Sequence, residues 1–219
     1  MQEWNGRPYL EPGTHQSDSD MLNQLGLTYQ NRKKKGDTVL AISTFEKCLA
    51  LKPDMYEPMV NVGVAYSELG NDQKASEIYL QALLLVPDNP AVLNNLAHLY
   101  VKLAKYVDAF ELSKRAMVLT PNHHDVKTTY QLTLVGMGNY YYLKKDYVKA
   151  LEYYFLAPEV QPAPSWVLEK IKNTTCIMGR DRECVKHLEQ MLTHPDFVHD
   201  SVNINRQIER IENRTRENV

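Results

Sequence analysis

The sequence is poor in the residues that build disulfide frameworks, flexible tracts and membrane spans. Only three of its 219 residues are cysteines, and this odd number at irregular spacing favours a reducing compartment over a disulfide framework. The nine glycines form no tract, and the longest aliphatic run, "ALLLV" (82–86), is far shorter than the roughly 20 apolar residues of a membrane-spanning helix. The N-terminus has no basic segment followed by an apolar core, so we expect no signal peptide. These absences predict a cytoplasmic protein without membrane insertion.

The chain also lacks an excess of charge of either sign. Its formal net charge is −2, with 24% charged and 43% hydrophobic residues, which is an ordinary balance for a soluble domain. Such a balance creates no long-range field that would attract nucleic acid, and no basic stripe is interleaved with aromatic residues. We therefore expect no nucleic-acid partner.

Constellations for catalysis or metal binding are equally scarce. His123 and His124 are adjacent, so on a helix their side chains point about 100° apart and do not form a metal-binding pair. Their neighbours Asn122 and Asp125 are instead expected to help cap the helix that starts here. There is no glycine-rich phosphate loop and no nucleophile elbow. The sequence predicts no enzymatic activity, no cofactor and no metal.

What the sequence does contain is an internal repeat. Ala41, Ala75 and Ala109 are spaced by 34 residues; Ala150 follows after 41 residues and Cys184 after another 34. A fixed period of this size is typical of solenoid architectures. Four further columns keep the same phase: small residues at Gly26, Gly63, Ala97 and Gly138; tyrosines at Tyr29, Tyr66, Tyr100 and Tyr141; Phe45, Tyr79, Ser113 and Tyr154; and Cys48, Ala82, Ala116 and Ala157.

Each repeat is predicted to form two helices. In the second repeat, "EPMVNVGVAYSEL" has apolar residues at helical spacing and stops at Gly70, and "DQKASEIYLQALLLV" runs to Pro87. Gly63 and Ala75 lack bulk, so the two helices can approach closely while Tyr79 fills the adjacent space. One such pair cannot bury its apolar faces alone, and stacked neighbours complete the core. The buried alanine columns also explain Cys48 and Cys184 as small apolar residues rather than reactive thiols.

This multi-column pattern resembles the tetratricopeptide repeat family. The resemblance implies an all-α fold, a right-handed α-solenoid of antiparallel helix pairs. It divides the chain into four clear units (19–55, 56–89, 90–123 and 124–164), a degenerate unit (165–197) in which Lys172 replaces the small residue, and a capping helix and tail (198–219). Residues 1–18 are expected to form an extended or disordered arm, whose Trp4, Tyr9 and Leu10 are left either free or docked.

Three departures from the family pattern predict local features. "NRKKKGD" adds three residues and places its lysines, Lys33 to Lys35, on a projecting turn. Seven extra residues after Pro121 are about two helical turns, so the next helix is expected to lengthen and protrude. The last helix is amphipathic and is expected to cap the array with one apolar side, made of Val202, Ile204, Ile208 and Ile211.

In tetratricopeptide arrays the first helix of each pair lines a concave face that holds extended peptides or partner helices. Gln24, Asn61 and Asn95 share one column, and side-chain amides can both donate to and accept from a peptide main chain. The column resembles the asparagine ladder of O-linked N-acetylglucosamine transferases, although asparagine is also common there for packing reasons. The candidate partner-binding residues are Asn23, Gln24, Leu27, Val60, Asn61, Val64, Asn94, Asn95, His98, Lys102, Asn139 and Tyr142, with Ser67 and Val135 beside them.

The same columns argue against one known family activity. No pair of cationic residues is present to hold a C-terminal carboxylate, so a chaperone-tail clamp is not expected. The leading hypothesis is a non-catalytic scaffold or adaptor that binds a protein or extended peptide in its groove. Two alternatives remain open, the targeting or regulatory region of a larger enzyme such as a glycosyltransferase, and a chaperone for secreted or pilus-type subunits. The oligomeric state is not predicted.

The tyrosine-rich stretch "NYYYLKKDYVKALEYYF" (139–155) first suggests a stacking platform for a ligand. In the register of the repeat, five of its six tyrosines fall at packing positions. Only Tyr142 is predicted to face the groove.

Overall fold

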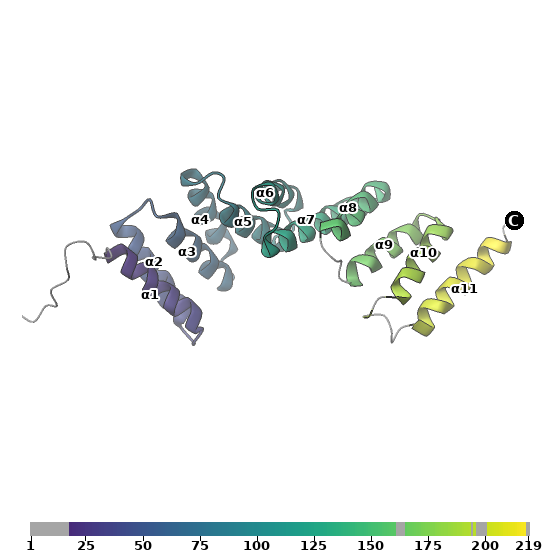
Figure 1. The fold of residues 1–219 in the computed structure, drawn as a ribbon, viewed down its shortest axis with the longest axis horizontal. Coiled ribbons are helices and arrows are strands. Elements are labelled where there is room, and N and C mark those ends of the chain that lie inside the picture. The colour runs from purple at the N-terminus through teal and green to yellow at the C-terminus, as the bar shows by residue number, and fades with distance from the viewer. Residues whose placement is uncertain (1–17, 161–164, 194, 196–200, 218–219) are drawn as a thin grey trace, which may run out of the picture. The chain divides into compact units, whose positions relative to one another are not determined.

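The chain folds into α-helices joined by turns over residues 18–160, 165–193, 195 and 201–217, the residues that the computed structural model describes (Figure 1). The all-α fold predicted from the repeat is confirmed, and consecutive helices pack as antiparallel pairs. The chain divides into two units, residues 1–87 and 88–219, each with its own packing.

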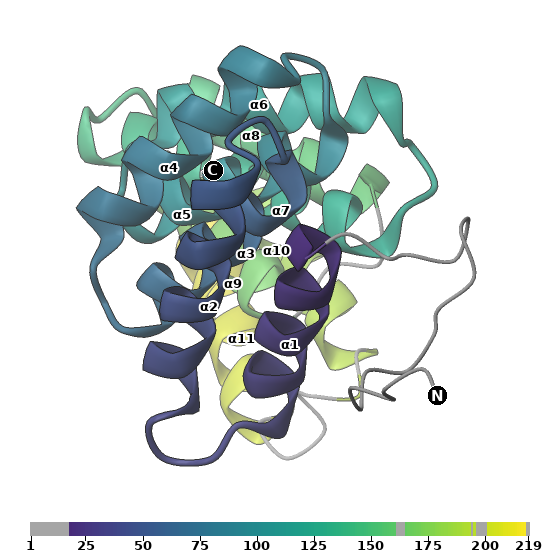
Figure 2. The same ribbon diagram turned by 90° about the vertical axis from the view of Figure 1, so that its left-hand side faces the viewer.

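The first unit holds two helix pairs. They are α1 (Asp18–Arg32), α2 (Asp37–Leu51), α3 (Tyr56–Glu68) and α4 (Asp72–Leu85). Each helix packs on the next one along the chain, and α1 also touches α3. Figure 2 shows α1 and α2 side by side, joined by a short loop at one end.

The second unit holds the remaining described helices. They are α5 (Pro90–Lys102), α6 (Tyr106–Leu119), α7 (His124–Leu143), α8 (Tyr147–Val160), α9 (Ser165–Ile177), α10 (Asp181–Leu192) and α11 (Ser201–Glu217). Again each helix packs on its successor, and α5 also packs on α7. The alternation of first and second helices therefore continues through this unit.

A glycine facing an aromatic ring interlocks the two helices of a pair. A β-carbon added at Gly63 would lie 2.5 Å from the ring of Tyr79, and one at Gly26 would lie 2.5 Å from the ring of Phe45. Tyr79 is 2% exposed, so its ring fills the space that the missing side chain leaves. The predicted close approach of the helices at the small-residue column is confirmed.

The α5–α6 pair uses a different combination at the same two positions. Ala97 stands where the α1–α2, α3–α4 and α7–α8 pairs have glycine, and the ring position holds Ser113; both are fully buried. Because an alanine methyl group takes the space that a ring would need, the smaller serine fits beside it. The Ser113 hydroxyl is hydrogen-bonded to the Thr133 hydroxyl of α7 at 2.8 Å.

The tyrosine column is half-buried and is accompanied by cations. Each tyrosine ring has a lysine or arginine over it, at 4.2 to 5.3 Å from the ring centroid, which is cation–π distance. The pairs are Tyr29 with Arg32, Tyr66 with Lys74, Tyr100 with Lys105, and Tyr141 with Lys149.

Helix α7 is lengthened to 20 residues, as the seven-residue insertion predicts, but the expectation that it protrudes is wrong. Val126, Thr129 and Gln131 in its first turns are each less than 5% exposed. The Tyr130 ring stacks on the Phe110 ring of α6 at 6.0 Å between centroids. The added turns extend the buried face of the second unit, since two whole turns keep that face in phase.

The start of α7 also differs from the predicted cap. His123 occupies the N-cap position, and its side chain makes no capping hydrogen bond, so the N-cap residue is neither Asn122 nor Asp125. Asp125 lies in the first turn, where a carboxylate interacts favourably with the positive end of the helix dipole.

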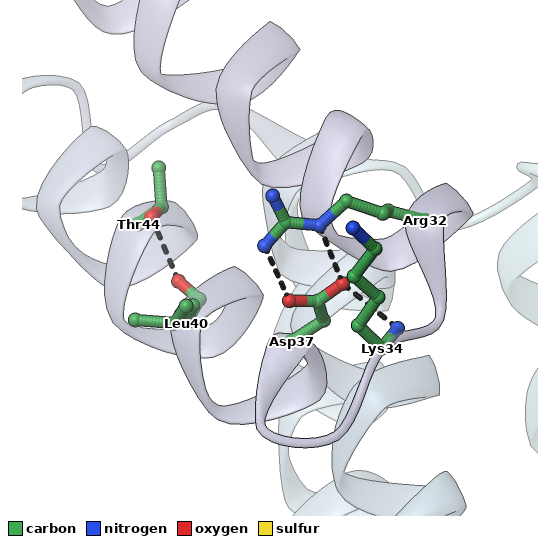
Figure 3. Close-up of polar contacts among 5 residues, drawn as sticks. All are labelled: Arg32, Lys34, Asp37, Leu40 and Thr44. Atoms are coloured by element: carbon green, nitrogen blue, oxygen red, sulfur yellow. Dashed lines mark hydrogen bonds and ion pairs between the residues drawn. The ribbon is translucent and has the colours of Figure 1, made fainter.

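A buried carboxylate organises the inserted loop between α1 and α2 (Figure 3). Asp37 is 2% exposed and accepts hydrogen bonds from Nη2 and Nε of Arg32, at 2.6 and 2.8 Å, and from the backbone N–H of Lys34 at 2.8 Å. The hydrogen-bonded guanidinium lowers the pKa of the Asp37 carboxyl to about 2. Gly36 has a φ of +90°, which lets the chain turn into α2. The lysines of this loop, Lys33 to Lys35, are exposed in the turn, as predicted.

Helix α11 packs on α10 through an apolar cluster. Ile204 is buried with Leu188 and Met191, and Ile208 and Ile211 pack at its edge. Val202 is 67% exposed, so its assignment to the apolar side of this helix is wrong.

Polar contacts also join α11 to α10. Asp181 accepts hydrogen bonds from Arg214 and from the Thr215 hydroxyl. Arg214 therefore contacts α10 rather than only solvent.

Candidate functional site

A cleft of about 180 Å³ opens in the second unit, beside the first half of α5. Its other wall is the connection after α6 and the start of α7, so the seven-residue insertion builds part of the cleft. The lining residues are Pro90, Ala91, Asn94, Asn95, Thr120, His123, Asp125 and Val126. Two of the predicted partner-binding residues, Asn94 and Asn95, thus lie together in a concave site.

Asn94, one of the residues that line this cleft, carries an unused hydrogen-bonding group. Its side-chain oxygen Oδ1 is buried and accepts no hydrogen bond from the residues that the structure describes. Asn23, at the same position of the repeat in the first unit, has a buried Oδ1 in the same condition. Because a buried carbonyl oxygen without a donor costs about 1–3 kcal/mol, an unpaired one calls for an explanation.

The face of α5 that contains Asn94 continues away from the cleft. His98 and Lys102 follow at intervals of four residues, which places them on the same side of the helix, and both are exposed. Asn95 is half-buried next to Asn94. This face presents an amide, an imidazole and an ammonium group in sequence along about two turns.

The predicted groove residues of α7 are engaged in packing. Oδ1 of Asn139 accepts a hydrogen bond from the Tyr154 hydroxyl at 2.8 Å. The Tyr142 ring packs edge-on against the Tyr147 ring, with 5.4 Å between centroids, and both asparagine and tyrosine are half-buried. Val135 is 2% exposed and belongs to the core, so its expected place beside the groove is wrong.

In the first unit, the candidate residues lie on α1 and α3. Leu27 packs against the cluster formed by Ala41, Phe45 and Val62. Gln24 is exposed, and the others are half-buried: Asn23, Leu27, Val60, Asn61, Val64 and Ser67.

The ionisable side chains that line the cleft are His123 and Asp125. Among the described residues there is no group of three or more histidine, cysteine or acidic side chains that could hold a metal ion. No helix in the described part of the chain has the length and apolar character to cross a membrane. The cleft therefore offers amide donors and acceptors, one imidazole and one carboxylate.

One covalent feature was missed by sequence reasoning. Cys176 and Cys184 form a disulfide bond between α9 and α10, with their Cα atoms 5.1 Å apart. The two cysteines lie at similar distances on either side of the turn at Gly179, so antiparallel helices bring them together; that symmetry was the available signal. Cys184 is fully buried, as its alanine column predicts, but it is not a free thiol. The bond removes the cysteine pattern as support for a reducing compartment, and the cytoplasmic location stays a prediction.

Helix pairs with a repeated small-residue interlock define an α-helical repeat protein. The family model for the tetratricopeptide repeat matches residues 34–99, which hold α2, α3, α4 and most of α5. Among curated protein sequences, no relative matches the chain.

Solved structures similar to this chain include other repeat proteins. MamA is 20% identical, with a TM-score of 0.64, over 83% of this chain and 94% of that one. PilF from Pseudomonas aeruginosa is 17% identical, with a TM-score of 0.58, over 88% and 91% of the two chains. A tetratricopeptide repeat protein from Parabacteroides merdae is 18% identical, with a TM-score of 0.54, over 80% and 64%. At these identities the likeness establishes the fold alone.

Proposed function

We propose that this chain is a non-catalytic adaptor that binds an extended protein segment, with the cleft between α5 and α7 as a contact site. The observation that carries the proposal is that Asn94, whose Oδ1 is buried and unpaired among the described residues, lines that cleft. A backbone N–H of a bound segment would supply the missing donor. Asn95 can both donate and accept hydrogen bonds. Asn94 and Asn95 would therefore bind the main chain of a segment with little dependence on the sequence of that segment.

The surroundings of the cleft fit such a ligand. Val126, Pro90 and Ala91 give apolar walls against which a side chain can pack, and the lining holds no cluster of like charge. The exposed face with His98 and Lys102 extends the contact along α5. Members of the tetratricopeptide repeat family typically mediate protein–protein interactions, which is consistent with this role.

The test uses a peptide selected by the whole chain from an unbiased displayed library. The double variant Asn94→Ala/Asn95→Ala is expected to weaken binding about tenfold or more, because each lost hydrogen bond is worth about 0.5–1.5 kcal/mol. A control, Asn203→Ala on the exposed surface of α11, should bind as the wild type does. Circular dichroism should show the same helical content for all three proteins.

A second arm tests main-chain recognition directly. N-methylation of the selected peptide at successive residues should identify one or two positions where binding is lost. A peptide that binds equally to the wild type and the double variant would place recognition elsewhere and refute this site.

A further inference from the structure

The last helix pair, α9 and α10, lacks the glycine–ring interlock found in the α1–α2, α3–α4 and α7–α8 pairs. The small-residue position is Lys172, which is half-buried, and the ring position is Leu188. Thr175 replaces the tyrosine of its column. In place of the glycine–ring contact, a covalent bond between Cys176 and Cys184 joins these two helices.

This bond adjoins the apolar cluster through which α11 packs on α10. Cys184 belongs to the buried cluster with Leu188, Met191 and Ile204, and Cys176 packs at the edge of the same cluster. The second contact of α11 also depends on the start of α10. Asp181, which pairs with Arg214, is only three residues before Cys184.

The two cysteines differ in exposure. Cys184 is fully buried, whereas Cys176 is half-buried, so the Cys176 side of the bond is the one more open to an external thiolate. Cys48, the remaining cysteine, is buried in the first unit and donates to the backbone carbonyl of Ser19.

We propose that the Cys176–Cys184 disulfide is a reversible redox switch that controls the packing of α11 on α10. In the oxidised form the bond holds α9 and α10 together, and α11 stays docked on the resulting apolar cluster. In the reduced form the pair has neither a covalent link nor a glycine–ring interlock, and α11 is released more often. Its release uncovers the apolar surface of Leu188 and Met191.

The exchange step requires a dithiol reductant. Its thiolate attacks Sγ of Cys176, the bond between the two cysteines breaks, and Cys184 leaves as a thiolate that takes up a proton. The second thiolate of the reductant then attacks the mixed disulfide, and Cys176 leaves and is protonated. The two cysteines gain two electrons and two protons in total, and the reductant is oxidised to a cyclic disulfide.

The experiment compares hydrogen exchange in the oxidised and the dithiothreitol-reduced full-length chain. Both carry Cys48→Ala, which copies the alanine of the corresponding column. Cys176 and Cys184 are then the only cysteines that can respond to dithiothreitol. Reduction should accelerate amide exchange in α9, α10 and α11 by about ten- to a hundredfold, the scale expected for opening a short disulfide-closed loop. Exchange in α5 and α6 should not change.

A second variant, Cys176→Ala/Cys184→Ala in the same background, keeps the test decisive. It should exchange in α9–α11 at the reduced rate and should not respond to dithiothreitol. Three results would each overturn the switch: no disulfide in the oxidised chain by thiol counting, a disulfide that native protein protects from millimolar dithiothreitol, or complete reduction with unchanged exchange in α11.

Discussion

The contact between Gly63 and the Tyr79 ring in the α3–α4 pair predicts the effect of Gly63→Ala on stability. The sign of that effect depends on the residue at position 79. In Gly63→Ala, the new methyl group would lie 2.5 Å from the Tyr79 ring, where ordinary contact needs 3.4–4 Å. The two helices must therefore separate by about 1 Å, or the ring must leave its rotamer. Tyr79 is 2% exposed, so it has no free space to enter. Overpacking of this kind typically costs about 1–3 kcal/mol.

The same substitution should be favourable once the ring is gone. In a Tyr79→Ser background nothing opposes the methyl group, and alanine is about 1 kcal/mol better than glycine within a helix. The chain itself contains this solution, since Ala97 is paired with Ser113 in the next repeat. The two single changes should therefore show a coupling free energy of about 2–4 kcal/mol, at the upper end of contacting pairs.

Native-state hydrogen exchange of α3 and α4 measures this cycle, because a two-unit chain does not support a single unfolding free energy. If Tyr79→Ser leaves the first unit too unstable for exchange analysis, Tyr79→Leu removes most of the clashing ring atoms and takes its place. An equal cost of Gly63→Ala in both backgrounds, or a gain in the wild type, would refute the interlock.

Two further predictions concern buried polar groups. The folded pKa of Asp37, about 2, lies below its ordinary value of 3.8, so its stabilisation is present above about pH 4 and is lost as the pH falls towards 2. The urea midpoint of the first unit should therefore exceed that of Asp37→Asn at pH 6, and the two midpoints should converge near pH 2; a constant gap would contradict the assignment. Tyr154→Phe removes the hydrogen bond to Asn139 and leaves its oxygen without that donor, which should cost about 1 kcal/mol in exchange protection of α7 and α8. Unchanged exchange protection of α7 and α8 in Tyr154→Phe would show that water replaces the hydroxyl.

Much of the architecture could be predicted from local sequence because the contacts within a helix pair join residues close along the chain and recur from one pair to the next. The Gly26–Phe45 and Gly63–Tyr79 contacts join residues 19 and 16 positions apart, within one pair, and they recur as columns in phase. The same register assigned most tyrosines of residues 139–155 to packing, and the stacked Tyr141 and Tyr153 rings agree with it. The register also predicted Tyr142 at the groove, but the packing of its ring on Tyr147 could not be read from its column.

The candidate site needed information that no repeat column contains. The columns identified Asn94 and Asn95 as candidates, but the insertion after Pro121 was expected to protrude. Only the packing of α7 on α5 and α6 turned that insertion into one wall of the cleft. The unpaired state of the Asn94 oxygen likewise follows from what surrounds it in space.

The sequence by itself determined the helix pairs, their small-residue contacts and the period of the repeat, because these depend on residues close along the chain and repeated in phase. The tertiary structure alone decided the burial of the inserted turns of α7, the cleft they form with α5, and the disulfide that replaces the interlock in the last pair. Each of these arises where the chain departs from its repeat. At such a departure the periodic pattern does not predict which residues a side chain contacts. The packing of the helices in three dimensions decides those contacts.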